Sequence, residues 1–123
     1  MKYLCLVYHE EKILNELPQS EYETLVDESL DLRETLRESG HLIDAEALQA
    51  VQSAASIRVR NGKVSMTDGP FAETKEQLGG FFLINAKDLN EAIHVASKIP
   101  GARFGTVEIR PIRALIRSRG VNE

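Results

Sequence analysis

Apolar residues gather in two short runs that predict buried β-strands. Residues 2–8 read Lys-Tyr-Leu-Cys-Leu-Val-Tyr, and residues 80–85 are again almost entirely apolar. Each run is too short for the core of a helix and is rich in residues that favour strands. Because neither run alternates apolar with polar positions, we expect both strands to be covered on both faces, as central strands of a sheet are.

A long amphipathic helix is predicted for residues 20–39, ended by Gly40. Ser20 and Glu23 have the spacing of a capping box at its start. At 100° per residue, one face collects the apolar side chains and the other faces collect the acidic ones. The predicted buried positions are Tyr22, Leu25, Val26, Leu32 and Leu36.

A second helix is predicted to begin at Asp88, with Glu91 in the capping-box position, and to end at Pro100. Its expected buried face consists of Leu89, Ala92, Ile93, Ala96 and Ile99. The two alanines would allow this helix to approach a sheet closely.

The remaining apolar positions predict edge strands and a hairpin. Residues 56–60 and 63–67 alternate apolar with polar side chains on either side of Asn61-Gly62, a strong hairpin signal. Residues 106–112 alternate in the same way, as an edge strand does. Residues 41–51 indicate a weaker, irregular edge strand.

Together these elements predict a single α+β domain over residues 1–123, ferredoxin-like βαββαβ with an inserted β-hairpin. That fold places its first and third main strands in the middle of the sheet, which agrees with the two fully apolar runs. Helices cover one face of such a sheet, so the other apolar face needs a cover. A second copy of the chain is the simplest cover, and we expect a homodimer with facing sheets.

Charge and composition narrow the classes of partner. The net charge is −4 and the isoelectric point is near 5.4, which argues against nucleic acid or an anionic membrane as the main partner. Five C-terminal arginines form a solvated face, pair with the acidic helix of a neighbour or bind an anion: Arg103, Arg110, Arg113, Arg117 and Arg119. The sequence shows neither a signal peptide nor an 18-residue apolar run, so we expect a cytoplasmic protein.

Neither metal nor cofactor binding is expected. The single cysteine, Cys5, lies in an apolar run and is expected to be a small buried hydrophobe. The three histidines, His9, His41 and His94, lack the spacing of metal ligands. His9, beside two glutamates at the end of the first strand, is the best of them for an acid or base role.

The segment 66–80 is rich in ionisable and hydroxyl side chains and connects two predicted strands. Asp68-Gly69-Pro70 is a turn string, and Phe71 is expected to pack inward as an anchor. Such an anchor would hold Glu73, Lys75 and Glu76 in defined places. Hydrated carboxylates on a plain connection are the alternative.

Two polar residues interrupt the apolar face of the first helix. Ser29 and Arg33 lie near its middle, one turn apart. In one interpretation Ser29 bonds its own helix and Arg33 extends its head to solvent. In the other, both face a polar pocket, and the carboxylate that pairs with Arg33 is Asp68. The predicted ligand-binding set is then Ser29, Arg33, Asp68, Glu73 and Lys75, and a small anionic or polar ligand is expected.

The stretch Met-Thr-Asp-Gly-Pro-Phe-Ala-Glu-Thr-Lys-Glu-Gln-Leu-Gly-Gly-Phe-Phe-Leu-Ile at 66–84 resembles the signature of the DGPF, or YCII-related, family. The resemblance implies a dimeric α+β barrel. It also implies a His/Asp pair in catalytic relatives, but Ser29 and Ile99 occupy those positions here. A mechanism based on that pair is therefore not expected, and the candidates for acid or base chemistry are Asp68, Glu73, Glu76 and His9.

Two functions follow from these observations. One is a small-molecule-binding or enzyme-like dimer with a polar pocket between the first helix, the sheet and the DGPF segment. The other is a non-catalytic regulatory or interaction module, because the family resemblance implies an association with extracytoplasmic-function sigma factors. A pocket lined by Ser29, Arg33 and Asp68 would favour the first. A solvated segment with a large apolar patch elsewhere would favour the second.

Overall fold

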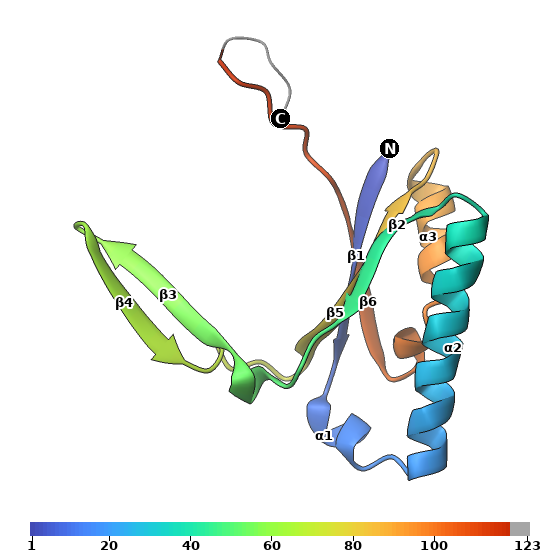
Figure 1. Ribbon diagram of the computed structural model, residues 1–123, viewed down its shortest axis with the longest axis horizontal. Coiled ribbons are helices and arrows are strands. Elements are labelled where there is room, and N and C mark those ends of the chain that lie inside the picture. The colour runs from blue at the N-terminus through green and yellow to red at the C-terminus, as the bar shows by residue number, and fades with distance from the viewer. Residues whose placement is uncertain (119–123) are drawn as a thin grey trace.

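Four antiparallel strands form the main sheet in the order β2-β5-β1-β6, and two further strands form a separate hairpin (Figure 1). The computed structural model describes residues 1–118, so Arg119 lies outside the described residues. The strands are β1 (Lys2–His9), β2 (Leu42–Ala47), β3 (Ala55–Arg60), β4 (Lys63–Asp68), β5 (Gln77–Asn85) and β6 (Gly105–Pro111). The helices are α1 (Glu11–Asn15), α2 (Gln19–Glu38) and α3 (Leu89–Ala96), with short 3₁₀ turns η1 (Val51–Ser53) and η2 (Pro100–Arg103).

The two fully apolar runs form the central strands, as predicted. Strand β1 pairs with β5 on one side and with β6 on the other, so that Cys5 lies opposite both Phe82 and Ile109. Strand β2 completes the sheet beside β5. This α+β order, with α2 and α3 in the two crossovers, is compatible with the predicted ferredoxin-like fold.

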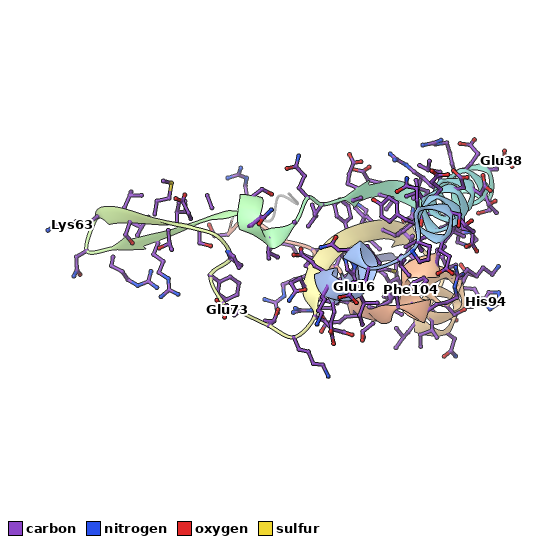
Figure 2. All side chains as sticks on the ribbon, turned by 90° about the horizontal axis from the view of Figure 1, so that it is seen from below. Glu16, Glu38, Lys63, Glu73, His94 and Phe104 are labelled. Carbon is purple, nitrogen blue, oxygen red and sulfur yellow. The ribbon has the colours of Figure 1, made fainter. Side chains whose placement is uncertain are left out.

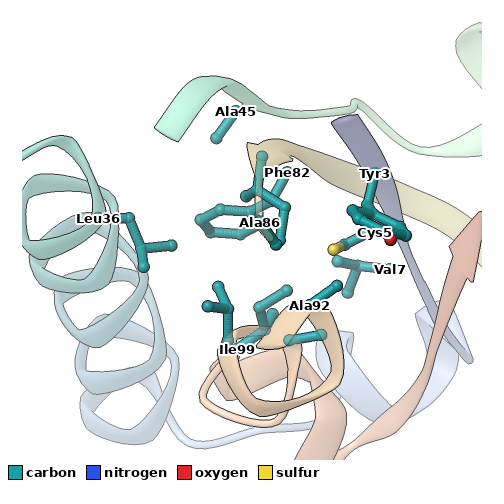
Figure 3. Close-up of a cluster of buried hydrophobic side chains, with 12 residues drawn as sticks. Tyr3, Cys5, Val7, Leu36, Ala45, Phe82, Ala86, Ala92 and Ile99 are labelled. Atoms are coloured by element: carbon teal, nitrogen blue, oxygen red, sulfur yellow. The ribbon is translucent and has the colours of Figure 1, made fainter. Parts of the chain in front are cut away.

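The core lies between the sheet and the two long helices, which cover the same face (Figures 1 and 3). Alternate residues of β1, Tyr3, Cys5 and Val7, point into it. Phe82 of β5 and Leu36 of α2 meet them there. The other face of the sheet has no helix against it among the described residues.

The start of α2 differs from the prediction. The N-cap is Pro18, whose carbonyl oxygen accepts hydrogen bonds from the backbone N–H groups of Glu21 and Tyr22. Ser20 therefore lies inside the first turn, where its side chain cannot cap the helix, and the predicted capping box is wrong. Of the predicted buried face, Leu25 and Leu36 are buried, Leu32 is half-buried, and Tyr22 and Val26 are exposed.

The start of α3 follows the prediction. Asp88 accepts a hydrogen bond from the backbone N–H of Glu91 at 2.9 Å. Ala92, Ala96 and Ile99 are buried, as expected, but Leu89 and Ile93 are each 48% exposed. Val95 is buried instead, because α3 approaches the sheet along its small residues and turns Leu89 and Ile93 outward.

The inserted hairpin is confirmed, and it projects away from the main sheet (Figures 1 and 2). Asn61 and Gly62 have positive φ angles of 51° and 75°, as the two central residues of a type I′ turn require. Strand β3 pairs with β4 over their whole length. The hairpin lies on the side of the sheet opposite α2 and α3 (Figure 1).

Phe71 does not anchor the segment that follows the hairpin. Its side chain is 80% exposed, so the predicted inward packing is wrong within the chain. Hydrogen bonds order the start of the segment instead: the backbone N–H of Gly69 donates to Ala54 O at 2.7 Å, and Ser56 Oγ donates to Gly69 O at 2.9 Å. These two bonds hold the backbone at Gly69 against the start of β3.

One of the C-terminal arginines pairs with the acidic helix of its own chain. Arg103 donates to both carboxylate oxygens of Glu28 on α2, at 2.7 and 3.2 Å. The hydrogen bond with Glu28 raises the pKa of Arg103 further, so this guanidinium stays charged. The pair ties η2 to the middle of α2.

No helix within residues 1–118 combines the length and apolar character needed to cross a membrane.

Candidate binding cavity beneath α2

A cavity of about 240 Å³ lies between α2 and the sheet. Helix α2 contributes a mostly apolar wall, interrupted only by the polar residues Ser29 and Arg33. The ends of β1, β2 and β5 contribute the opposite side, with His9, Gly79 and Gly80 among the lining residues. The cavity is closed further by Ile99 and by the aromatic ring of Phe104.

Ser29 bonds its own helix. Its Oγ donates to the carbonyl oxygen of Leu25 at 2.8 Å, which is the first of the two interpretations left open by the sequence. Ser29 nevertheless lines the cavity, and its hydroxyl oxygen retains acceptor capacity because a hydroxyl has two lone pairs. Ser29 can therefore accept a hydrogen bond from a ligand, but its hydroxyl hydrogen is already donated to Leu25.

Arg33 is only partly satisfied by the protein. Its Nε is buried and has no hydrogen-bond partner among the described residues. Its Nη1 lies 3.9 Å from Glu46 Oε1, beyond hydrogen-bond distance, and its side chain is 33% exposed. The buried N–H of this guanidinium has lost water as a partner without gaining an acceptor from the protein, which costs free energy.

Glu46, and not Asp68, is the carboxylate beside Arg33. The sequence offered no direct signal for this pair, because Glu46 belongs to the weakly predicted edge strand. In the folded chain β2 lies next to β5 at the edge of the sheet, close to α2. The pair depends on that placement.

His9 lies at the end of β1 with its imidazole ring over Gly79. A Cβ at position 79 would overlap this ring. The strand register shifts at this point, between Val7 and Tyr8, which marks a β-bulge. The glycine and the bulge together make room for His9 at the cavity wall.

The other predicted site residues do not line this cavity. Asp68 ends β4 and is exposed, and Glu73 is exposed in the following segment. Lys75 Nζ lies 4.0 Å from Glu10 Oε1, and Glu76 Oε1 accepts a hydrogen bond from Thr106 Oγ1 at 2.9 Å. The structure thus brings Ser29, Arg33 and His9 to one cavity and leaves Asp68, Glu73, Lys75 and Glu76 outside it.

The two positions that replace the family's His/Asp pair both line the cavity. Ser29 and Ile99 are far apart in the sequence, but the fold brings both to the lining of this cavity. Ile99 is 3% exposed and carries no group for proton transfer. Neither residue can act as the histidine or the aspartate that the resemblance implies for catalytic relatives.

A second polar cluster joins the end of α2 to the start of α3. His41 Nδ1 lies 2.7 Å from Ser39 Oγ, and His41 Nε2 lies 3.2 Å from Glu91 Oε1. Ser39 Oγ also donates to Leu36 O, so the cluster serves the C-terminal end of α2. Within residues 1–118, no group of three or more His, Cys, Asp or Glu side chains is arranged to hold a metal ion.

Comparison with known proteins agrees with the signature at 66–84. The family model for the YCII-related domain matches residues 1–116. An uncharacterized protein of Rhizobium meliloti (strain 1021) is 34% identical over 114 residues, which cover 91% of this chain and 92% of that protein. The match spans the sheet, both long helices and the inserted hairpin. The chain therefore belongs to the YCII-related family.

Proposed function

We propose that this YCII-related protein binds a small molecule in the cavity beneath α2, as a homodimer. The observation that carries the proposal is Arg33, whose buried Nε has no hydrogen-bond partner within residues 1–118 at the wall of a mostly apolar cavity. A buried donor without an acceptor costs about 1 to 3 kcal/mol. A bound carboxylate or hydroxyl oxygen would supply the acceptor and recover that free energy.

The size and lining of the cavity favour a one-ring ligand. An apolar cavity of about 150 Å³ is large enough to bind benzene, and this cavity is about 240 Å³. Apolar side chains from α2 and the sheet suit an aromatic ring, and Arg33 suits one anionic or hydroxyl substituent. The Ser29 hydroxyl oxygen offers an acceptor beside this donor.

Binding is better supported than catalysis by the family's residue pair, because Ser29 and Ile99 cannot replace a histidine and an aspartate. Of the four acid or base candidates, His9 alone lines the cavity. An enzymatic role would therefore act through His9 and not through Asp68, Glu73 or Glu76.

The homodimer is supported by the sheet face that no helix covers. Leu4 and Leu6 of β1 lie opposite Leu83 and Phe81 of β5 on this face, and all four are half-buried in the single chain. Two such faces packed together would form the α+β barrel expected for the family.

A regulatory or interaction module, of the kind associated with sigma factors, is the second candidate. The observation that favours it is the set of apolar side chains exposed on and beside the hairpin, including Phe71 at 80%. Such a surface suits a protein partner.

Titration of the ¹⁵N-labelled protein with benzoate, 4-hydroxybenzoate and toluene, a control that has no hydrogen-bond acceptor, tests the binding proposal. We expect the two carboxylates to shift the amide signals of residues around Ser29, Ala47 and Gly80. Arg33→Met should weaken carboxylate binding at least about tenfold, as the loss of a charge-assisted hydrogen bond does.

Arg37→Met is the matched control, since Arg37 lies one turn further on α2 in an exposed pair with Glu34. This variant should bind like the wild type. Equal binding by the Arg33 and Arg37 variants, or shifts confined to the outer surface, would contradict the proposal.

A further inference from the structure

We infer that the β3–β4 hairpin, here called the arm (residues 55–68), packs its apolar face onto a second copy of this chain. The inference rests on the proposed homodimer and adds the segment that holds it together. In Figures 1 and 2 the arm extends from the domain on the side of the sheet that no helix covers.

The arm has one apolar face and one polar face. Ile57 lies opposite Met66, and Val59 lies opposite Val64, so these four side chains form a ladder on one side. They are 67%, 67%, 54% and 69% exposed, respectively. The alternate pairs, such as Arg58 opposite Ser65, place polar and basic groups on the other side.

Such an arm is not stable by itself. A two-stranded hairpin in water is at best marginally stable and needs a further apolar surface against it. Within the described chain the ladder finds no such surface, because its four members are all more than half exposed. The apolar surface must come from another molecule.

The exposed area of the chain matches the requirement of a stable dimer. The chain exposes 9061 Å², whereas a compact monomer of its mass, 13.7 kDa, exposes about 6,600 Å². The excess is about 2,500 Å² per chain, or about 5,000 Å² for two chains, and obligate dimers bury about 2,000 to 5,000 Å² in total over both subunits. Contact between two copies would remove this excess.

The charges favour a second copy over another partner. The arm carries three basic residues, Arg58, Arg60 and Lys63, and one carboxylate, Asp68, so its net charge is +2. Because the whole chain has a net charge of −4, the residues outside the arm have a net charge of −6. The uncovered sheet face has an apolar centre with Asp44 on one edge strand and Glu108 and Arg110 on the other. A basic arm and a net acidic remainder of the same chain attract each other in a two-fold dimer, where each copy gives one arm and receives one.

Sedimentation velocity of the full chain over the micromolar range tests the inference. We expect the wild type to be a dimer. Ile57→Thr combined with Val64→Thr keeps β-branched residues in both strands but removes apolar area twice per dimer, and should weaken dimerisation at least about 100-fold. Ser65→Thr, on the polar face of the same strand, is the matched control and should dimerise like the wild type.

A charge variant provides a second, fold-neutral test. Arg58→Glu combined with Arg60→Glu alters only the exposed polar face and should weaken dimerisation about tenfold at low salt, with a smaller effect at high salt. Hydrogen exchange of the β3 and β4 amides should slow as the wild type dimerises.

The outcomes separate the inference from the proposed dimer. If the wild type is a dimer and both arm variants dimerise as tightly as Ser65→Thr, the arm is not part of the interface and the inference is overturned while the dimer stands. If the wild type remains a monomer throughout, both are overturned, and the exposed ladder supports the interaction module instead.

Discussion

The imidazole ring of His9 lies over Gly79, in the space that a side chain at position 79 would occupy. The two residues come from adjacent central strands, β1 and β5, beside the β-bulge that interrupts their regular pairing. This contact sets the position of the only acid or base candidate that lines the cavity.

Gly79→Ala is therefore expected to destabilise the protein by about 1 to 3 kcal/mol, as over-packing does. Urea unfolding of Gly79→Ala, His9→Ala and the double variant checks this in a double-mutant cycle. In the His9→Ala background the alanine at 79 should cost less, because the ring is gone. An equal cost in both backgrounds would show that the ring is not what the new methyl group meets.

Phe71→Ala should cost less than about 1 kcal/mol in the monomer, since the ring is 80% exposed and exposed substitutions have small effects. Phe82→Ala is the contrasting variant. Phe82 is in the core, and its loss should cost about 3 to 5 kcal/mol. Chemical denaturation at a protein concentration too low for dimerisation measures both free energies of unfolding. A large decrease for Phe71→Ala would support Phe71 as an anchor after all.

Cys5 gives the protein a stability change at high pH. Burial raises the pKa of its thiol to about 11 from an ordinary value of 9.0. Between these values the unfolded chain releases the thiol proton while the folded chain keeps it, so the free energy of unfolding falls as the pH rises. Below about pH 9 the thiol is protonated in both states, and its contribution is constant.

The comparison of wild type with Cys5→Ala isolates this effect, because the variant lacks the titrating group. The difference in their unfolding free energies should stay constant up to about pH 9 and shrink by about 1 to 2 kcal/mol toward pH 11. A difference that does not change over this range would show that the thiol is not desolvated in the folded state.

Local sequence patterns are enough to predict the main strands, the two helices α2 and α3, the hairpin and the family. The two fully apolar runs identified the central strands β1 and β5, because only strands covered on both faces lack polar alternation. Asn61-Gly62 fixed the hairpin, since few residues adopt two successive positive φ angles. The DGPF signature identified the family that the model for residues 1–116 confirms.

Contacts between side chains from distant parts of the chain follow from the three-dimensional packing and not from local patterns. The sequence placed Ser29 and Arg33 together because helical periodicity acts over one turn, but it paired Arg33 with Asp68, and Glu46 is the carboxylate that lies beside it. Phe71 was predicted to be buried because its side chain is apolar. The prediction was wrong because hydrophobicity does not reveal that the hairpin leads away from the core. Local patterns report which face a residue shares with its neighbours, whereas contacts between α2, β2 and the arm depend on how twisted strands and helices are packed in three dimensions.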